Sequence, residues 1–166
     1  MLTTIGYEGA RPDDFVRSLC VAGVDLIVDV RDRAQSRRPG FSKSVLQLSL
    51  TGAGIGYVHL RDLGDPKAGR EAARAGDLKK FVQIYSKVLE TEEARAALEW
   101  VAEAAQTKTV CLLCYERDPK ACHRTLVAER ISAITGLKAR HLGVAQFEQA
   151  QQPARRVRDT RQSVTA

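Results

Sequence analysis

Short apolar runs separated by longer amphipathic stretches constrain the fold of this 166-residue chain more than any other feature. The runs at 26–28 and 110–113 are apolar at consecutive positions and too short for buried helices. Strands of this kind are covered on both faces, as in parallel sheets whose connections run through helices. The alternation therefore predicts an α/β fold: a single Rossmann-like domain with a mostly parallel sheet and helices on both faces.

The expected elements follow from hydrophobic periodicity and from Gly and Pro stop signals. Strands are predicted over 2–6, 25–30, 55–60, 109–113 and 138–142, and helices over 12–22, 44–50, 78–89, 92–105 and 125–134. The segment 61–76 is rich in Gly, Asp and Arg and is expected to be a loop with one poor helical turn. The domain is expected to span residues 1–143. The Gln- and Arg-rich remainder, 144–166, has too few apolar residues for a core and is expected to be a disordered basic tail.

Several classes of protein are disfavoured by composition. The sequence opens without a basic segment followed by an apolar one, and no apolar stretch approaches the ~20 residues that a membrane span needs. We therefore expect a cytoplasmic protein without a membrane partner. In that reducing compartment Cys114 and Cys122 are expected to be free thiols, whereas Cys20 and Cys111 lie in apolar runs and are expected to pack as small hydrophobic residues.

The net charge of +6 is concentrated in two places. The loop 31–43 carries four arginines and a lysine against a single acid, Asp32, and further arginines crowd the tail. A basic balance of this kind suits an anionic partner, either a small anionic ligand or a nucleic-acid backbone.

Four of the expected strands end in polar or charged residues. These ends are Gly6-Tyr7-Glu8-Gly9, Asp29-Val30-Arg31, His59-Leu60-Arg61 and Cys114-Tyr115-Glu116-Arg117. Ligands of open parallel sheets bind just beyond the carboxyl ends of the strands. The pattern therefore predicts one shared site at that edge of the sheet.

The segment from Cys114 to Arg124 is the richest in chemistry. Because an apolar helix follows it, Cys122 is expected near a helix N-terminus, where anions and thiolates are stabilised. Arg124 in the first helical turn is disfavoured by the helix dipole, and a bound anion would explain it. We therefore expect an anion beside Arg124 and a reactive thiol at Cys114 or Cys122.

Two other interpretations of this segment are possible. Lys120 stands where a phosphatase-type loop has its arginine, so that class is disfavoured. Cys114, Cys122 and His123, with a fourth ligand such as His59 or Glu8, have the donor types of a zinc or iron site. Adjacent Cys and His residues are an uncommon ligand pair, so no cofactor is predicted, with zinc or iron as the alternative.

Carboxylates at the other strand ends complete the expected site. Glu8 lies between two glycines, where a ligand can approach the backbone closely. Asp29 ends an apolar strand and is expected to pair with Arg31. His59 is either a core histidine or a member of the site.

A resemblance to a known family rests on motifs in a fixed order. They are Thr4-Ile5-Gly6-Tyr7-Glu8-Gly9, Asp29-Val30-Arg31, Ser36-Arg37-Arg38-Pro39-Gly40-Phe41, Leu63-Gly64, and Cys114-x-Glu116 followed by Cys122-His123-Arg124. On these motifs residues 2–143 resemble the bacterial and archaeal proteins grouped as domain of unknown function 488. The resemblance implies a Rossmann-like α/β domain, no particular reaction, and a site made of Tyr7, Glu8, Asp29, Arg31, Arg38, Cys114, Glu116, Cys122, His123 and Arg124.

The expected function is an enzyme, of the hydrolase or transferase class, that acts on a small phosphorylated, nucleotide-like or nucleobase-containing substrate. Anion binding is expected from Tyr7, Arg31, Arg38 and Arg124, and acid–base or nucleophilic chemistry from Cys114, Glu116, Cys122, His123, Glu8 and Asp29. The alternative is a nucleic-acid-binding or nucleic-acid-processing module that uses the basic loop 31–43 and the arginine tail.

Overall fold

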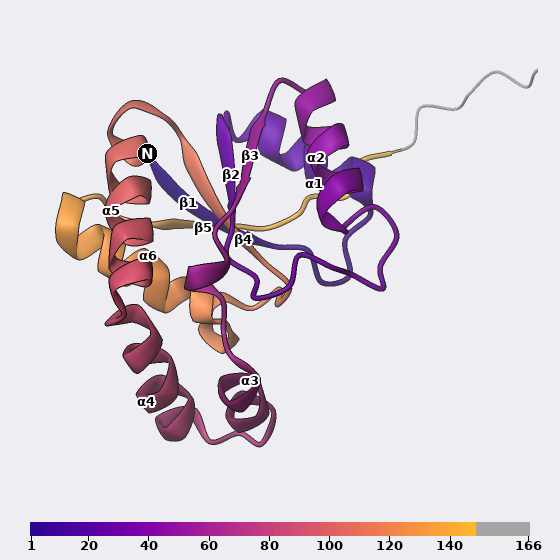
Figure 1. The fold of residues 1–166 in the computed structure, drawn as a ribbon. Helices are drawn as coiled ribbons and strands as arrows, with labels where there is room; N and C mark the ends of the chain where they lie inside the picture. Colours follow the sequence, from indigo (N-terminus) through magenta and orange to yellow (C-terminus); the bar gives the residue numbers. More distant parts are fainter. Residues whose placement is uncertain (149–166) are drawn as a thin grey trace, which may run out of the picture.

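A computed structural model describes residues 1–148 and shows a five-stranded, all-parallel sheet between two layers of helices (Figure 1). The strand order is β3-β2-β4-β1-β5. The strands are β1 (Leu2–Gly6), β2 (Leu26–Asp29), β3 (Gly56–His59), β4 (Val110–Cys114) and β5 (Arg140–Leu142). The helices are α1 (Pro12–Val21), α2 (Lys43–Gly52), α3 (Lys67–Arg74), α4 (Leu78–Leu89), α5 (Glu92–Thr107) and α6 (His123–Thr135). The predicted α/β class, the parallel sheet and the helices on both faces are confirmed.

Alternate side chains of the central strands enter two separate cores. Ile27 and Cys111 pack with α1 and α2 on one face, whereas Val28, Leu112 and Cys114 pack with α4, α5 and α6 on the other. This is the period of two expected of strands. Cys111 and Cys114 thus lie on opposite faces of the sheet, as expected of residues three apart in a strand.

The segment 61–76 contains more regular structure than predicted. A 3-10 helix covers Arg61–Leu63, and α3 follows Pro66 and packs against α4. The buried side of α3 is formed by Gly69 and Ala72, which are too small to produce a hydrophobic stripe in the sequence. Tertiary packing on α4 therefore forms a helix that hydrophobic periodicity does not reveal.

Residues just beyond 143, the expected end of the domain, contact α1. The chain after β5 runs along α1, where Ala145 N donates to Ser18 Oγ and Phe147 N donates to Asp14 Oδ1. Arg17 stacks on the Phe147 ring at 4.3 Å. The rest of the predicted disordered tail, 149–166, lies outside the described residues.

Two further observations concern the predictions on cysteines and membranes. Cys114 and Cys122 are free thiols, as predicted, and Cys111 is buried. Cys20 was expected to pack as a small hydrophobic residue, but it is exposed because it lies on the solvent side of α1. Within residues 1–148 no helix is both long and apolar enough to cross a membrane.

Candidate functional site

The topology creates a crevice at the carboxyl end of β4. β1 and β2, the two neighbours of β4, lead into α1 and α2 on one face of the sheet, whereas β4 leads into α6 on the other face (Figure 1). Adjacent loops therefore separate at this point, which is where open parallel sheets bind ligands. A cavity of about 430 Å³ lies here, and its wall includes Cys114, Glu116 and His123.

Close backbone packing holds the loop that follows β4. Glu8 N donates to Tyr115 O at 2.8 Å, so the ends of β1 and β4 remain paired beyond the strands. A Cβ atom at Gly6 would lie 1.8 Å from the carbonyl oxygen of Glu116. Only glycine fits at this position, and the approach fixes where the loop leaves the sheet.

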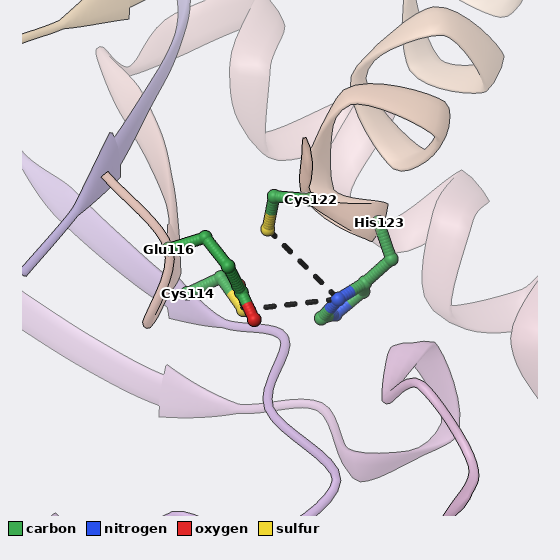
Figure 2. Close-up of side chains that lie close together, drawn as sticks. All are labelled: Cys114, Glu116, Cys122 and His123. Carbon is green, nitrogen blue, oxygen red and sulfur yellow. Dashed lines mark hydrogen bonds between the residues drawn. The ribbon is translucent and has the colours of Figure 1, made fainter. Parts of the chain in front are cut away.

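Cys114, Glu116, Cys122 and His123 form one compact cluster (Figure 2). Cys114 ends β4, Cys122 is the extended residue that caps α6, and His123 is the first residue of that helix. One ligand-type atom of each residue lies within 4.8 Å of those of the other three. Cys114 Sγ is 3.1 Å from Glu116 Oε2 and 3.7 Å from His123 Nδ1, and Cys122 Sγ is 4.0 Å from the same nitrogen.

A hydrogen bond on the side of the ring away from the thiols fixes the orientation of His123. Its Nε2 atom is 2.7 Å from the carbonyl oxygen of Val30, which can only accept, so Nε2 carries a proton. Nδ1 therefore faces the two thiols. Tyr85 packs against the ring edge-to-face at 5.2 Å, and its hydroxyl donates to Leu63 O at 2.6 Å.

Burial governs the titration of this cluster. It raises the pKa of the Cys114 thiol, and it raises the pKa of Cys122 well above the ordinary value, with neighbouring Cys114 adding to the shift. Burial opposes ionisation of Glu116 and His123 too, but hydrogen bonds from the thiols lower the pKa of Glu116, and contacts with Cys122 raise that of His123. Desolvation therefore acts against the low thiol pKa expected from the position of Cys122 near the helix N-terminus.

Arg124 supports the loop instead of lying open in the cavity. It is 1% exposed, and its guanidinium donates to the carbonyl oxygens of Glu116 and Arg117 and to Thr4 Oγ1. These bonds tie α6 to the loop after β4. They account for an arginine in the first helical turn without the expected anion.

Asp29 and Arg31 form the predicted pair, fully buried. Arg31 Nε and Nη2 donate to the two carboxylate oxygens at 2.8 and 2.6 Å, in bidentate geometry. Tyr7 and Tyr57 complete the network, since Arg31 Nη1 donates to the Tyr7 hydroxyl and the Tyr57 hydroxyl donates to Asp29 Oδ2. Burial alone would lower the pKa of Arg31, but bonding and charge from Asp29 outweigh it and raise it. Arg31 and Tyr7 line the cavity; Asp29 lies behind them.

Three other predicted residues lie at the margin of the site or outside it. Glu8 Oε2 accepts from Arg117 N at 3.0 Å, and its side chain lines a different cavity of about 480 Å³ with Arg117. His59 Nε2 is 2.7 Å from the carbonyl oxygen of Arg31, and His59 is not part of the cluster. The fourth member of the cluster is Glu116, not His59 or Glu8. Arg38 lines the cavity and donates to Ala10 O, and its buried Nε atom has no partner among residues 1–148.

Sequence reasoning missed Asp65 and Arg70. Asp65 is 6% exposed and lines the cavity, and within the described part of the chain its buried Oδ1 atom has no hydrogen-bond partner. Burial raises the pKa of Asp65 from 3.8 to about 6, although nearby His123 and Arg70 lower it. Arg70 donates to Asp65 O and is 3.3 Å from Asp32 Oδ2. The sequence signal that could have indicated Asp65 is its position directly after the motif Leu63-Gly64.

The fold and site define a class of protein: a Rossmann-like α/β domain with a thiol, carboxylate and imidazole cluster beside a cavity at the carboxyl ends of its strands. The chain belongs to the family described as "Domain of unknown function DUF488", whose model matches residues 11–131. The resemblance seen in the sequence motifs is thereby confirmed. No curated protein and no solved structure matches the chain.

Proposed function

We propose that the protein is an enzyme, a hydrolase or transferase, that binds a small phosphorylated or nucleotide-like substrate in the 430 Å³ cavity. One observation carries the proposal. The same cavity has arginines on its rim and the Cys114, Glu116 and His123 side chains in its wall, so a bound anion would lie beside groups that can do chemistry.

Of the arginines predicted to bind the anion, Arg38 lines the cavity, but two others serve a different purpose. Arg31 and Arg124 are already bonded to protein atoms and hold the site together. Arg33 and Arg37 in the basic loop and Arg74 on α3 also line the cavity, and all three are exposed. One guanidinium group can donate to two phosphate oxygens at once, so we assign these three arginines to bind the substrate phosphate and call them the substrate clamp.

Asp65 is the proposed general acid or base. A catalytic carboxyl works best when its pKa lies near the operating pH, and burial raises that of Asp65 to about 6. Its Oδ1 atom lacks a partner among the described residues, and Asp65 is one of the residues that line the cavity. Glu116, held by the thiols, is less suited to this role because its pKa is lowered.

Binding is tested by calorimetric titration of the full chain with a nucleoside monophosphate, with inorganic phosphate and with the uncharged nucleoside. The double variant Arg33→Ala/Arg37→Ala should bind the two anions at least about tenfold more weakly, a loss of about 1.4 kcal/mol. The matched control is Arg140→Ala, because Arg140 is exposed on β5 and does not line the cavity. Equal affinities for the wild type and the double variant would refute the proposed clamp.

The same titration distinguishes the nucleic-acid alternative. A single-stranded oligonucleotide that binds more tightly than the mononucleotide, with an affinity that falls steeply with salt, would favour a nucleic-acid module over the enzyme. Turnover of a phosphate-ester panel provides the second arm. Asp65→Asn should lower kcat by about 10²- to 10⁴-fold with little change in substrate affinity. Undiminished turnover by this variant would rule out Asp65 as the acid or base.

A further inference from the structure

The four-residue cluster has features that hydrogen bonding alone does not explain. Two thiols, a carboxylate and an imidazole converge from the end of β4 and the start of α6, and three of the four residues are buried (Figure 2). Cys114 Sγ contacts Glu116 and His123, and Cys122 Sγ contacts His123, so these contacts of the two thiols stay within the cluster. Burying these polar groups is costly unless hydrogen bonds or a common bound ion satisfy them.

The spacing of the donor atoms matches a tetrahedral ion. With Zn–S of about 2.3 Å and Zn–N of about 2.0 Å, tetrahedral angles place sulfur and nitrogen ligands about 3.5 Å apart. The two sulfur–nitrogen distances here are 3.7 and 4.0 Å, and the sulfur–oxygen distance is 3.1 Å. The remaining pairs of donor atoms lie within 4.8 Å of one another, so side-chain shifts of up to about an ångström would complete the coordination.

The imidazole is already oriented as a metal ligand. Metal-bound histidines commonly donate their other ring N–H to a backbone carbonyl or a carboxylate, which fixes the tautomer. His123 does this through Nε2 and the Val30 carbonyl, so the lone pair of Nδ1 faces the thiols. The adjacent residues Cys122 and His123 both reach the cluster because the backbone is extended at Cys122 and helical from His123 onward.

We propose that Cys114, Glu116, Cys122 and His123 bind one zinc ion. Borderline-soft zinc accepts a mixture of thiolate, imidazole and carboxylate ligands without a preferred d-electron geometry, which suits this donor set. Cys114, Glu116 and His123 line the cavity, and Cys122 closes the buried side, so the ion faces the space where a ligand enters. Glu116 is the least buried of the four and is the ligand that a water or substrate oxygen can replace. This exchange rests on the proposed function, whereas zinc binding itself does not.

The test requires no substrate. The full chain is stripped with chelator, and zinc affinity is measured by competition with a chromophoric chelator, followed by elemental analysis of the reloaded protein. About one equivalent of zinc is expected. Cys114→Ser and Cys122→Ser should each weaken zinc binding by at least about 100-fold. Cys20→Ser is the matched control: it makes the same chemical change at an exposed cysteine outside the cluster and should leave the affinity unchanged.

A second measurement covers variants that fail to fold. Cobalt added to the stripped wild-type chain should produce thiolate-to-cobalt charge-transfer absorption and the intense visible bands of tetrahedral coordination, and zinc should remove both. The proposal would be overturned if cobalt produced only weak octahedral bands without charge transfer. It would also be overturned if the folded Cys114→Ser and Cys122→Ser chains bound zinc with the affinity of the wild type. Preference for iron over zinc in direct competition would overturn the choice of metal.

Discussion

Replacement of Asp65 by asparagine should stabilise the protein at neutral pH but not in acid. The carboxyl is 6% exposed, its Oδ1 atom lacks a hydrogen-bond partner within residues 1–148, and burial raises its pKa to about 6. Asparagine has the same shape and carries no charge to desolvate. The bond between Arg70 and the Asp65 backbone carbonyl does not involve the substituted group and is retained.

The size of the effect follows from the pKa shift. A rise from 3.8 to about 6 corresponds to about 3 kcal/mol at 1.36 kcal/mol per unit, and water in the adjoining cavity reduces this to about 2 kcal/mol. The folded state binds the proton more tightly than the unfolded state, so the wild type loses stability as the pH rises from about 4 to about 6. The Asp65→Asn chain should not show that loss.

Urea unfolding of the chelator-treated protein, at about pH 4 and about pH 7.5, measures the difference. Asp65→Asn should raise the free energy of unfolding by about 2 kcal/mol at the higher pH and change it little at the lower one. Asp62→Asn is the control, because Asp62 is an exposed acid in the same segment. Equal effects of Asp65→Asn at both pH values, or a loss of stability at pH 7.5, would refute the reasoning.

Two further predictions concern the buried pair and the thiols. Asp29→Asn should lower the free energy of unfolding in urea by about 3–5 kcal/mol, because it leaves the Arg31 guanidinium buried without its carboxylate. A loss below about 1 kcal/mol, as for a surface pair, would show that the pair contributes little. In metal-free folded protein, alkylation with peptide mapping should label exposed Cys20 much faster than Cys114 and Cys122, whose pKa values are raised by burial. Labelling of Cys114 or Cys122 at the rate of Cys20 would contradict that burial.

Much of the fold and part of the site could be predicted from local patterns. Consecutive apolar residues located the central strands, and helical periodicity located α4. The rule that ligands bind beyond strand ends predicted that Cys114, Glu116 and His123 lie together, and they do. The reason is that a parallel sheet aligns the carboxyl ends of all its strands at one edge. The short helix α3 was missed, because its packing side consists of Gly69 and Ala72.

Residue roles within the site depended on contacts that no local pattern reports. Arg124 and Glu8 have the charges of ligand-binding residues, yet each is bonded to the backbone of the loop after β4. Asp65 follows a short glycine motif in a segment without periodicity, and only its burial beside Glu116 and His123 gives it a perturbed pKa.

The sequence by itself determined the alternation of strands and helices, the parallel sheet, and the segment that carries the cysteines and His123. These features depend on periodicity and on the order of residues along the chain, which the sequence records directly. The tertiary structure alone decided that Glu116, not His59, completes the cluster, that Arg33 and Arg37 remain exposed at the cavity while Arg31 and Arg124 are bonded, and that Asp65 faces the site. The physical reason is that packing decides which polar atoms are bonded to other protein groups and which remain available to a ligand, and packing is settled by residues far apart in the chain.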